Sequence, residues 1–279
     1  MNTIIKTDFG KIEYSIIGKG KPILFLHGGH SNCHETLFLK GYSTDSFKLI
    51  IPSRPGYGET PLGENKQPIA AAKLIISMLN KLDIEKVIIV GISAGGLTAI
   101  ELTSNFPERV EKLILISAVT KKWLHPKDKM YQQGIRLFSP KREKFIWQLY
   151  RICFRFFPNR MAKVLIGELS TKQNPKITKQ EIDEIRQMTF NQRSKEGFIT
   201  DLEQNIDASV IAKIKCPTLI LHSKNDKSVS IEMATYANKN IRNSNLKVYA
   251  NKWGHLLWVG LESEQPISEV NKFINSDLN

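Results

Sequence analysis

The chain has 279 residues, of which 41% are hydrophobic and 24% are charged, values that are ordinary for a globular protein. This length allows one large α/β domain, or a core with an inserted subdomain. No apolar run reaches the roughly 18 residues that a membrane span needs, and the apolar stretch after Thr3 is too short for a signal peptide. Cys33, Cys153 and Cys216 are scattered without C-x-x-C spacing, so neither a disulfide framework nor a zinc site is expected. The composition therefore predicts a reduced, cytoplasmic protein.

The net charge is strongly positive and unevenly placed. It amounts to +13, from 40 basic and 27 acidic residues. Residues 121–165 hold twelve basic residues against two acidic ones, a net charge of +10 in one segment. Such a field attracts anionic small molecules or an anionic lipid surface, although it is also typical of a solvated helical surface. No nucleic-acid-binding motif accompanies the charge, so nucleic acid is not an expected partner.

The first part of the chain alternates strand and helix patterns. Residues 11–17 predict a half-exposed strand, and the glycines at 18–20 predict a hairpin turn after it. Apolar runs predict buried strands over 22–26, 47–51, 87–90 and 110–119, and a helix is predicted over 68–81. Repeated β–α alternation with short connections predicts a mostly parallel, twisted sheet flanked by helices.

This rhythm breaks after Thr120. Residues 121–209 carry helix signals and no good buried strand, so we expect an inserted helical cap, with residues 1–120 and 210–279 forming the core. Thr178-Lys-Gln-Glu181 is a capping-box pattern that opens one of its helices.

An apolar stripe at helical spacing runs through this expected cap. Its residues are Phe145, Leu149, Ile152 and Phe156, and we expect it to pack the cap on the core or to line an acyl or aryl pocket. The strand rhythm returns over 216–222, followed by Asp226. A last short strand over 246–249 precedes His255, and a closing helix is expected over 265–274.

Gly91-Ile-Ser93-Ala-Gly95 is a G-x-S-x-G pattern between a buried strand and a helix. The turn there must be sharp, which requires small residues, and it lifts the Ser93 hydroxyl above the sheet edge beside the first amides of the helix. The alternative is a small-residue β–turn–α junction with an incidental serine. The strand–turn–helix context favours a nucleophile.

A serine hydroxyl needs a base to take its proton, and an imidazole titrates close to neutral pH. His255 is the candidate base. A carboxylate on the other ring nitrogen fixes the tautomer and stabilises the imidazolium. Asp226 is the candidate acid because it lies at the carboxyl end of a late strand, where such sites gather.

On these residues the chain resembles the α/β-hydrolase family, over nearly its whole length. His27-Gly-Gly29 resembles the family's oxyanion loop, Arg54-Pro-Gly-Tyr-Gly58 resembles the loop after its next strand, and the order Ser, acid, His is the family's order. The resemblance implies the α/β-hydrolase fold, a Ser93–His255–Asp226 triad, and an oxyanion hole formed by the amides of Gly29 and Ala94.

The resemblance also gives expectations for three further residues, Ser53, His27 and His30. The family often has an acid where this chain has Ser53, which we expect to alter loop hydrogen bonding but not the chemistry. His27 is expected to brace the oxyanion loop and His30 to lie at the pocket mouth. Neither histidine has the spacing of a metal pair.

We therefore expect a serine hydrolase that cleaves the acyl bond of a small, partly apolar substrate through an acyl-enzyme, without a metal or organic cofactor. A carboxylester is favoured, and thioester, lactone, amide or carbon–carbon bonds stay open. A serine rather than an aspartate at the nucleophile position disfavours dehalogenase and epoxide-hydrolase chemistry. The basic cap favours anionic or amphiphilic substrates, and weak association with anionic membranes. The alternative is a ligand-binding receptor on the same fold with slow or no turnover.

Overall fold

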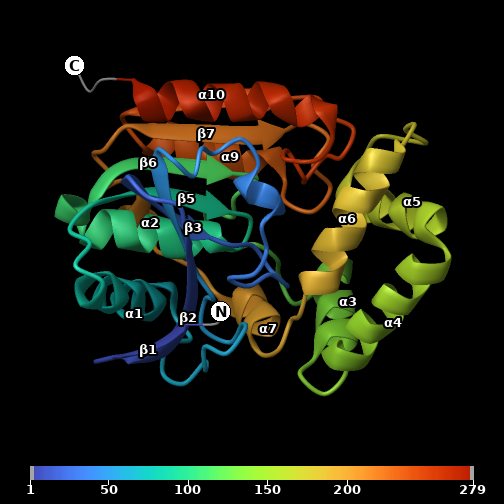
Figure 1. Ribbon diagram of the computed structural model, residues 1–279, viewed down its shortest axis with the longest axis horizontal. Coiled ribbons are helices and arrows are strands. Elements are labelled where there is room, and N and C mark those ends of the chain that lie inside the picture. The colour runs from blue at the N-terminus through green and yellow to red at the C-terminus, as the bar shows by residue number, and fades with distance from the viewer. Residues whose placement is uncertain (1–2, 277–279) are drawn as a thin grey trace.

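The computed structural model describes residues 3–276 and contains one eight-stranded sheet, in the order β1-β2-β4-β3-β5-β6-β7-β8 (Figure 1). From β4 to β8 all neighbouring strands are parallel, whereas β1 and β2 add an antiparallel edge. The predicted mostly parallel sheet is confirmed. The strands span Thr3–Thr7, Gly10–Ile17, Lys21–Leu26, Phe47–Pro52, Val87–Ile92, Val110–Ile116, Thr218–Ser223 and Ser244–Tyr249, from β1 to β8.

The predicted hairpin turn at residues 18–20 is wrong. β2 pairs with β1 and β4 and not with β3, so the hairpin of this edge lies between β1 and β2. The glycine turn instead hydrogen-bonds to the chain before β4, where the Lys19 amide donates to the Thr44 carbonyl at 3.0 Å. β1 itself was not predicted, because most of its residues are exposed and its five positions show little apolar pattern.

The two faces of the sheet bury separate cores. Along β5, Val87 and Ile89 pack into one core, and Ile88, Val90 and Ile92 pack into the other. This alternation follows from the two-residue period of a strand, and it explains why a strand covered on both faces is apolar throughout.

Helices cover both faces (Figure 1). α1 (Pro68–Lys81), α2 (Gly95–Asn105) and α9 (Ile231–Asn240) bury apolar residues in the first core. α10 (Glu264–Asn275) buries Val270 and Ile274 in the second core. Within the described residues, no helix is both long enough and apolar enough to cross a bilayer.

Six helices lie between β6 and β7, and the arrowheads of the parallel strands point toward the first four of them (Figure 1). This group of helices therefore lies over the carboxyl ends of the strands, where open α/β sheets form their sites. Within the group, the predicted Thr178 capping box is confirmed, because Thr178 caps α6 and the Glu181 side chain accepts from the Thr178 amide. The helices are α3 (Lys129–Phe138), α4 (Glu143–Phe156), α5 (Pro158–Leu169), α6 (Lys179–Asn191), α7 (Gly197–Glu203) and α8 (Ala208–Ile211).

The apolar stripe of α4 does not pack as predicted. Phe145, Leu149, Ile152 and Phe156 are all exposed, while Trp147 and Phe154 are the large apolar residues of α4 that are buried. Apolar side chains occur on every side of this helix, so periodicity alone does not decide which side faces the core.

Candidate active site

Ser93 sits on a strained turn between β5 and α2. Its φ is +49°, a left-handed conformation that is rare for residues other than glycine. The Ser93 carbonyl accepts hydrogen bonds from the amides of Gly96 at 3.0 Å and Val119 at 2.9 Å, which fix the turn. At Gly95, an added Cβ would lie 2.2 Å from the Leu26 carbonyl oxygen, so only glycine fits there.

The structure brings the predicted serine, histidine and aspartate together. The Ser93 Oγ lies 3.0 Å from His255 Nε2, and His255 Nδ1 lies 2.8 Å from Asp226 Oδ2. All three residues are buried. A carboxylate accepts only, so Nδ1–H donates to Asp226, and Nε2 is left to accept the serine hydroxyl proton.

Backbone contacts hold the acid and the base in place. Asp226 Oδ1 accepts from the amides of Ser228 at 2.9 Å and Val229 at 2.8 Å. The His255 amide donates to the Leu169 carbonyl at 3.0 Å, and Leu169 is the last residue of α5. The helices between β6 and β7 therefore help to position the imidazole.

A second buried histidine, His222, contacts the acid. His222 Nε2 is 2.9 Å from the Val229 carbonyl and 3.4 Å from Asp226 Oδ2. Burial lowers the pKa of His222 more than the Asp226 carboxylate raises it. His222 supports the loop that carries Asp226.

The loop after β3 passes directly beside Ser93. A Cβ added to Gly28 would lie 2.9 Å from the Ser93 Cβ, so this glycine is required for the close approach. Within residues 3–276, neither the Gly29 amide nor the Ala94 amide donates to a protein acceptor. Two backbone donors are thus unused at the positions predicted for the oxyanion hole.

His27 braces this loop, as the sequence indicates. Its Nε2 accepts from the Arg54 amide at 3.0 Å, which leaves the proton on Nδ1 to donate to the Gly28 carbonyl at 2.8 Å. Burial and the neighbouring Arg54 guanidinium hold the pKa of His27 well below its usual value. His27 is therefore a neutral structural residue.

A buried ion pair connects the same loop to α7. The Arg54 guanidinium donates two hydrogen bonds of 2.7 Å to the Asp201 carboxylate, and its Nε donates to the His27 carbonyl at 2.7 Å. The Tyr57 hydroxyl donates to Asp201 at 2.5 Å. Burial opposes the charge on Arg54, but the interactions with Asp201 and Tyr57 together outweigh it and raise the pKa of the guanidinium. Asp201 was not predicted, because nothing in its local sequence indicates a partner 147 residues away.

A carboxylate does lie next to Ser53, but it comes from another strand. The Ser53 hydroxyl donates to Glu13 Oε2 at 2.8 Å, and the same oxygen accepts from the Glu59 amide at 2.8 Å. Burial alone would raise the pKa of Glu13, but these hydrogen bonds and one from His34 lower it. The hydrogen bonding of this loop therefore differs as predicted, because Glu13 on β2 supplies the acceptor for Ser53.

Glu13, Cys33 and His34 are the group of possible metal ligands in the described chain. The protonation and hydrogen bonding of these side chains do not favour a metal. Burial raises the pKa of the Cys33 thiol to about 12, which keeps it protonated, and Glu13 is already occupied by the Ser53 and Glu59 donors.

A cavity of about 570 Å³ opens beside Ser93 and His255. Its volume is in the range of small-molecule sites. Its wall carries seven aromatic side chains, four of which come from the helices between β6 and β7. They are Phe38, Trp123, Phe138, Trp147, Tyr150, Phe198 and Trp258.

Three polar groups of the cavity wall come from the loop after β3. Glu35 is buried, its Oε1 accepts from the Leu37 amide at 2.8 Å, and its Oε2 has no hydrogen-bond partner among the described residues. Burial raises the pKa of this carboxyl. The Ser31 hydroxyl is also unpartnered in the described structure. His30 stacks on Phe198 at 3.9 Å between ring centroids, and burial lowers its pKa to about 3.

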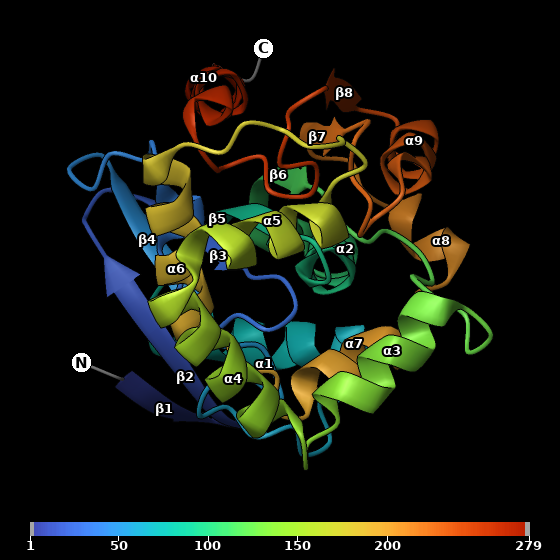
Figure 2. The same cartoon turned by 90° about the vertical axis from the view of Figure 1, so that its right-hand side faces the viewer.

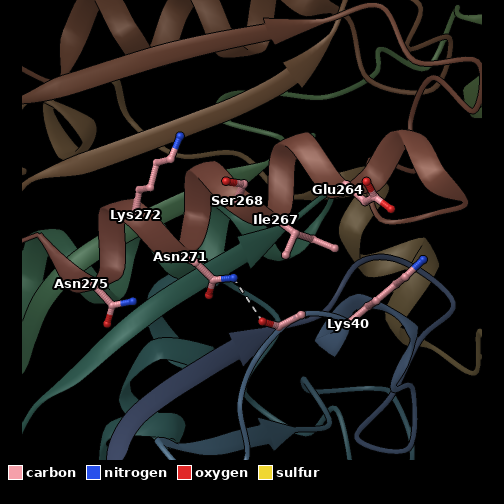
Figure 3. Close-up of a pocket in the computed structure, with 8 residues that line it drawn as sticks. Lys40, Glu264, Ile267, Ser268, Asn271, Lys272 and Asn275 are labelled. Atoms are coloured by element: carbon pink, nitrogen blue, oxygen red, sulfur yellow. Dashed lines mark hydrogen bonds between the residues drawn. The ribbon is translucent and has the colours of Figure 1, made fainter.

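A second, open hollow lies between α10 and the loop at Lys40 and Gly41 (Figure 3). There the Asn271 side chain donates to the Gly41 carbonyl at 3.2 Å. This hollow contains none of the predicted site residues, and its lining joins Lys40, Lys272 and Glu264 to amide and aliphatic groups. It carries no nucleophile–base pair.

A strained serine, an adjacent imidazole and carboxylate, and unused amides at the carboxyl ends of a parallel sheet define a hydrolase. A family model described as alpha/beta hydrolase fold matches residues 21–258. The protein named "Uncharacterized hydrolase YcgS" from Bacillus subtilis is 40% identical over 278 residues, which cover 98% of each chain. The chain therefore belongs to the alpha/beta hydrolase family.

More distant relatives agree with this assignment. A 2-hydroxy-6-oxononadienedioate/2-hydroxy-6-oxononatrienedioate hydrolase from Pseudomonas putida is 26% identical, with 88% of this chain and 85% of that protein covered. An alpha/beta hydrolase fold protein from Nakamurella multipartita superposes with a TM-score of 0.81 at 21% identity, with 98% of both chains covered. This last likeness concerns the fold alone.

Proposed function

We propose that the protein is a serine hydrolase that cleaves a carboxylic ester of a small, partly apolar substrate through an acyl-enzyme on Ser93. The observation that carries the proposal is the continuous hydrogen-bonded chain from Ser93 Oγ to His255 to Asp226, with separations of 3.0 and 2.8 Å. These distances lie within the range expected of a nucleophile and its base.

The first step forms the bond between Ser93 Oγ and the acyl carbon. His255 Nε2 takes the hydroxyl proton as the bond forms, and Asp226 stabilises the resulting imidazolium without taking its proton. The carbonyl oxygen becomes negative and accepts hydrogen bonds from the Gly29 and Ala94 amides. Because these donors are fixed in the backbone, little reorganisation is needed when the charge develops.

The second half of the cycle reverses these transfers. His255 gives its proton to the leaving alkoxide, and the alcohol departs. A water molecule then attacks the acyl carbon while His255 accepts its proton, and cleavage of the acyl–Oγ bond returns the proton to Ser93. Every proton in this scheme passes through His255 Nε2.

The cavity favours an apolar acyl or alcohol group. Its charged lining residues are Glu35, Glu168 and Arg136, which do not give the cavity the positive charge seen on the surrounding segment. This distribution weakens the expectation that the basic cap selects anionic substrates inside the cavity. The unpartnered Glu35 Oε2 and the Ser31 hydroxyl are available to hydrogen-bond a polar group of the substrate.

We further propose that residues 121–209 act as a cap over the core formed by residues 1–120 and 210–279. Trp147, Tyr150 and Leu165 of this segment line the cavity, and α5 also holds the His255 backbone. Cap movement would therefore change both access to Ser93 and the position of its base.

Hydrolysis of a carbon–carbon bond next to a carbonyl is the second candidate. The reason is the 26% identical Pseudomonas putida relative, whose name describes a hydrolase of 2-hydroxy-6-oxo dienedioates. Both reactions leave an acyl group to be released by water, and they differ in whether an alkoxide or a carbon leaving group must be protonated.

A paired substrate panel tests the proposal. The purified chain and the Ser93→Ala variant are compared on p-nitrophenyl esters of increasing acyl length and on a 2-hydroxy-6-oxodienoate. We expect ester turnover that the variant lacks, highest for apolar acyl groups. Turnover of the dienoate alone would assign the second reaction, and ester turnover that survives in Ser93→Ala would refute the assignment of the nucleophile.

A further inference from the structure

An apolar ridge runs along the outer side of α4 and continues into α5. The fractional exposure of its side chains is 67% for Phe145, 68% for Phe156 and 56% for Phe157, values more usual for charged residues. Figure 2 looks onto these helices, and Figure 1 shows them at the end of the molecule farthest from α1 and α2. The ridge consists of Phe145, Leu149, Ile152, Phe156, Phe157 and Val164.

The part of the ridge on α4 is continuous because of its spacing. Phe145, Leu149, Ile152 and Phe156 follow one another at intervals of four, three and four residues, which places them on one face of α4. The same helix buries Trp147 and Phe154 on another side, so packing within the chain does not account for the outward face. Scattered exposed apolar residues need no explanation, but a contiguous row of this size marks an interaction site.

Exposed cations flank the ridge. Lys144 and Arg155 lie next to Phe145 and Phe156 in the sequence, and Lys163 precedes Val164. The Arg160 guanidinium lies 5.9 Å from the centre of the Phe157 ring. None of these four cations forms an ion pair with an acidic residue of the described chain.

Acidic groups are scarce on the same surface. Glu143 is the one acidic residue within α4, and it is buried and paired with Arg193 at 2.7 Å. On α5 the acidic residue is Glu168, near the end of the helix. The outward surface of α4 therefore combines apolar side chains with unneutralised positive charge.

We propose that the α4–α5 ridge docks the protein on the surface of an anionic phospholipid bilayer. A helix with an apolar face and flanking Lys and Arg side chains lies in the plane of the headgroups, with its apolar side chains in the acyl boundary and its cations on the phosphates. A second copy of the chain fits less well, because two segments of net charge +10 would meet.

The ridge also adjoins the cavity. Val164 is 50% exposed and lines the cavity wall, as do Met130 and Leu137 of α3, which are also exposed. A molecule docked through the ridge would thus present this edge of the cavity to the lipid. This consequence rests on the proposed function, whereas docking itself does not.

Vesicle co-sedimentation with the full-length Ser93→Ala variant separates docking from turnover. Vesicles of phosphatidylcholine alone are compared with vesicles of equal parts phosphatidylcholine and phosphatidylglycerol, at about 0.05 M and 0.5 M salt. We expect binding to the anionic vesicles that weakens at high salt, where surface charges are screened, and little binding to the neutral vesicles. Equal binding to both compositions would overturn the proposal.

Two pairs of variants locate the contact. Phe145→Ser with Phe156→Ser should weaken partitioning at least tenfold, because two aromatic side chains no longer leave water, whereas Leu261→Ser, at a site 69% exposed outside these helices, should not. Lys144→Glu with Lys163→Glu should weaken partitioning by at least about fivefold per site, whereas Lys81→Glu with Lys239→Glu should have a smaller effect.

The remaining outcomes identify other occupants. Equal losses in the test and control pairs would show that net charge, not the ridge, drives binding, and would refute docking through α4 and α5. Concentration-dependent self-association that disappears in the Phe145/Phe156 variant, without vesicle binding, would assign the ridge to a second copy. Binding to polyglutamate but not to anionic vesicles would assign it to an acidic protein partner. Either result would overturn the lipid assignment.

Discussion

Asp201→Ala removes one partner of the buried ion pair that joins α7 to the loop after β4. Both side chains are 3% exposed, and the carboxylate accepts two hydrogen bonds from Arg54 and one from Tyr57. The substitution leaves the Arg54 guanidinium buried without a counter-charge, which costs about 3–5 kcal/mol in comparable pairs. The two hydrogen bonds lost by Arg54, at about 1.5–3 kcal/mol each, give a similar magnitude, and the buried Tyr57 hydroxyl loses its acceptor as well. Against a total stability of about 5–15 kcal/mol, this is a large loss.

Urea unfolding of the wild type and the variant measures this loss directly. Lys272→Ala is the matched control, because Lys272 is 71% exposed and 3.3 Å from Glu269, and it should cost less than about 1 kcal/mol. Arg54→Met combined with Asp201→Leu should recover part of the stability, since no unpaired charge is left. A cost below about 1 kcal/mol for Asp201→Ala would refute this reasoning.

The same variant should also lower activity below its folding transition. Arg54 Nε donates to the His27 carbonyl, directly before the glycines of the proposed oxyanion loop. A displacement of that loop by a fraction of an ångström to 1 Å should reduce kcat on the order of tenfold to a hundredfold. Unchanged kcat in the folded variant would show that Arg54 does not position the loop.

Three further predictions concern the site. Asp226→Asn should retain the fold and lower kcat about 10³–10⁴-fold, because the tautomer of His255 is no longer fixed; a loss below tenfold in steady-state kinetics would contradict this. Burial raises the pKa of Glu35, so the stability that its protonated form contributes is lost as pH rises through that pKa. Glu35→Gln should therefore raise the melting temperature at pH 8 and lose this advantage below about pH 4. An advantage independent of pH would show that the charge of Glu35 is not its cause. The pKa of His30 is lowered to about 3, so the stability that its neutral form contributes is lost as pH falls from about 6.5 toward 3. The His30→Asn variant removes this group, and Asn tolerates the local φ of +65°. Between pH 4.5 and 5.5, the free energy of unfolding of the variant should therefore change with pH by up to about 1.4 kcal/mol per pH unit less than that of the wild type.

The sequence predicted the sheet core because its strands are buried on both faces. Runs such as 87–90 are apolar without interruption, which is typical of a parallel sheet covered by helices on both faces. The serine, acid and histidine were predictable because each follows a parallel strand of this sheet, and the carboxyl ends of parallel strands meet at one edge.

The features that the sequence did not reveal depend on long-range partners. β1 has exposed side chains and is recognised only through its pairing with β2. Asp201 and Glu13 carry no local signal, and their roles follow from contacts with Arg54 and Ser53 that lie far away in the chain. The outward face of α4 was mistaken for a packing face, because its periodicity is the same whichever side contacts the core.

Mass spectrometry of the intact protein after reaction with a fluorophosphonate tests the central assignment most directly. The probe phosphonylates an activated serine hydroxyl with loss of fluoride, and the mass therefore rises by one phosphonyl group. We expect one adduct per chain, located by peptide mapping on Ser93, slowed in His255→Ala and missing in Ser93→Ala. An unmodified wild-type chain, or an adduct on a serine other than Ser93, would contradict the account.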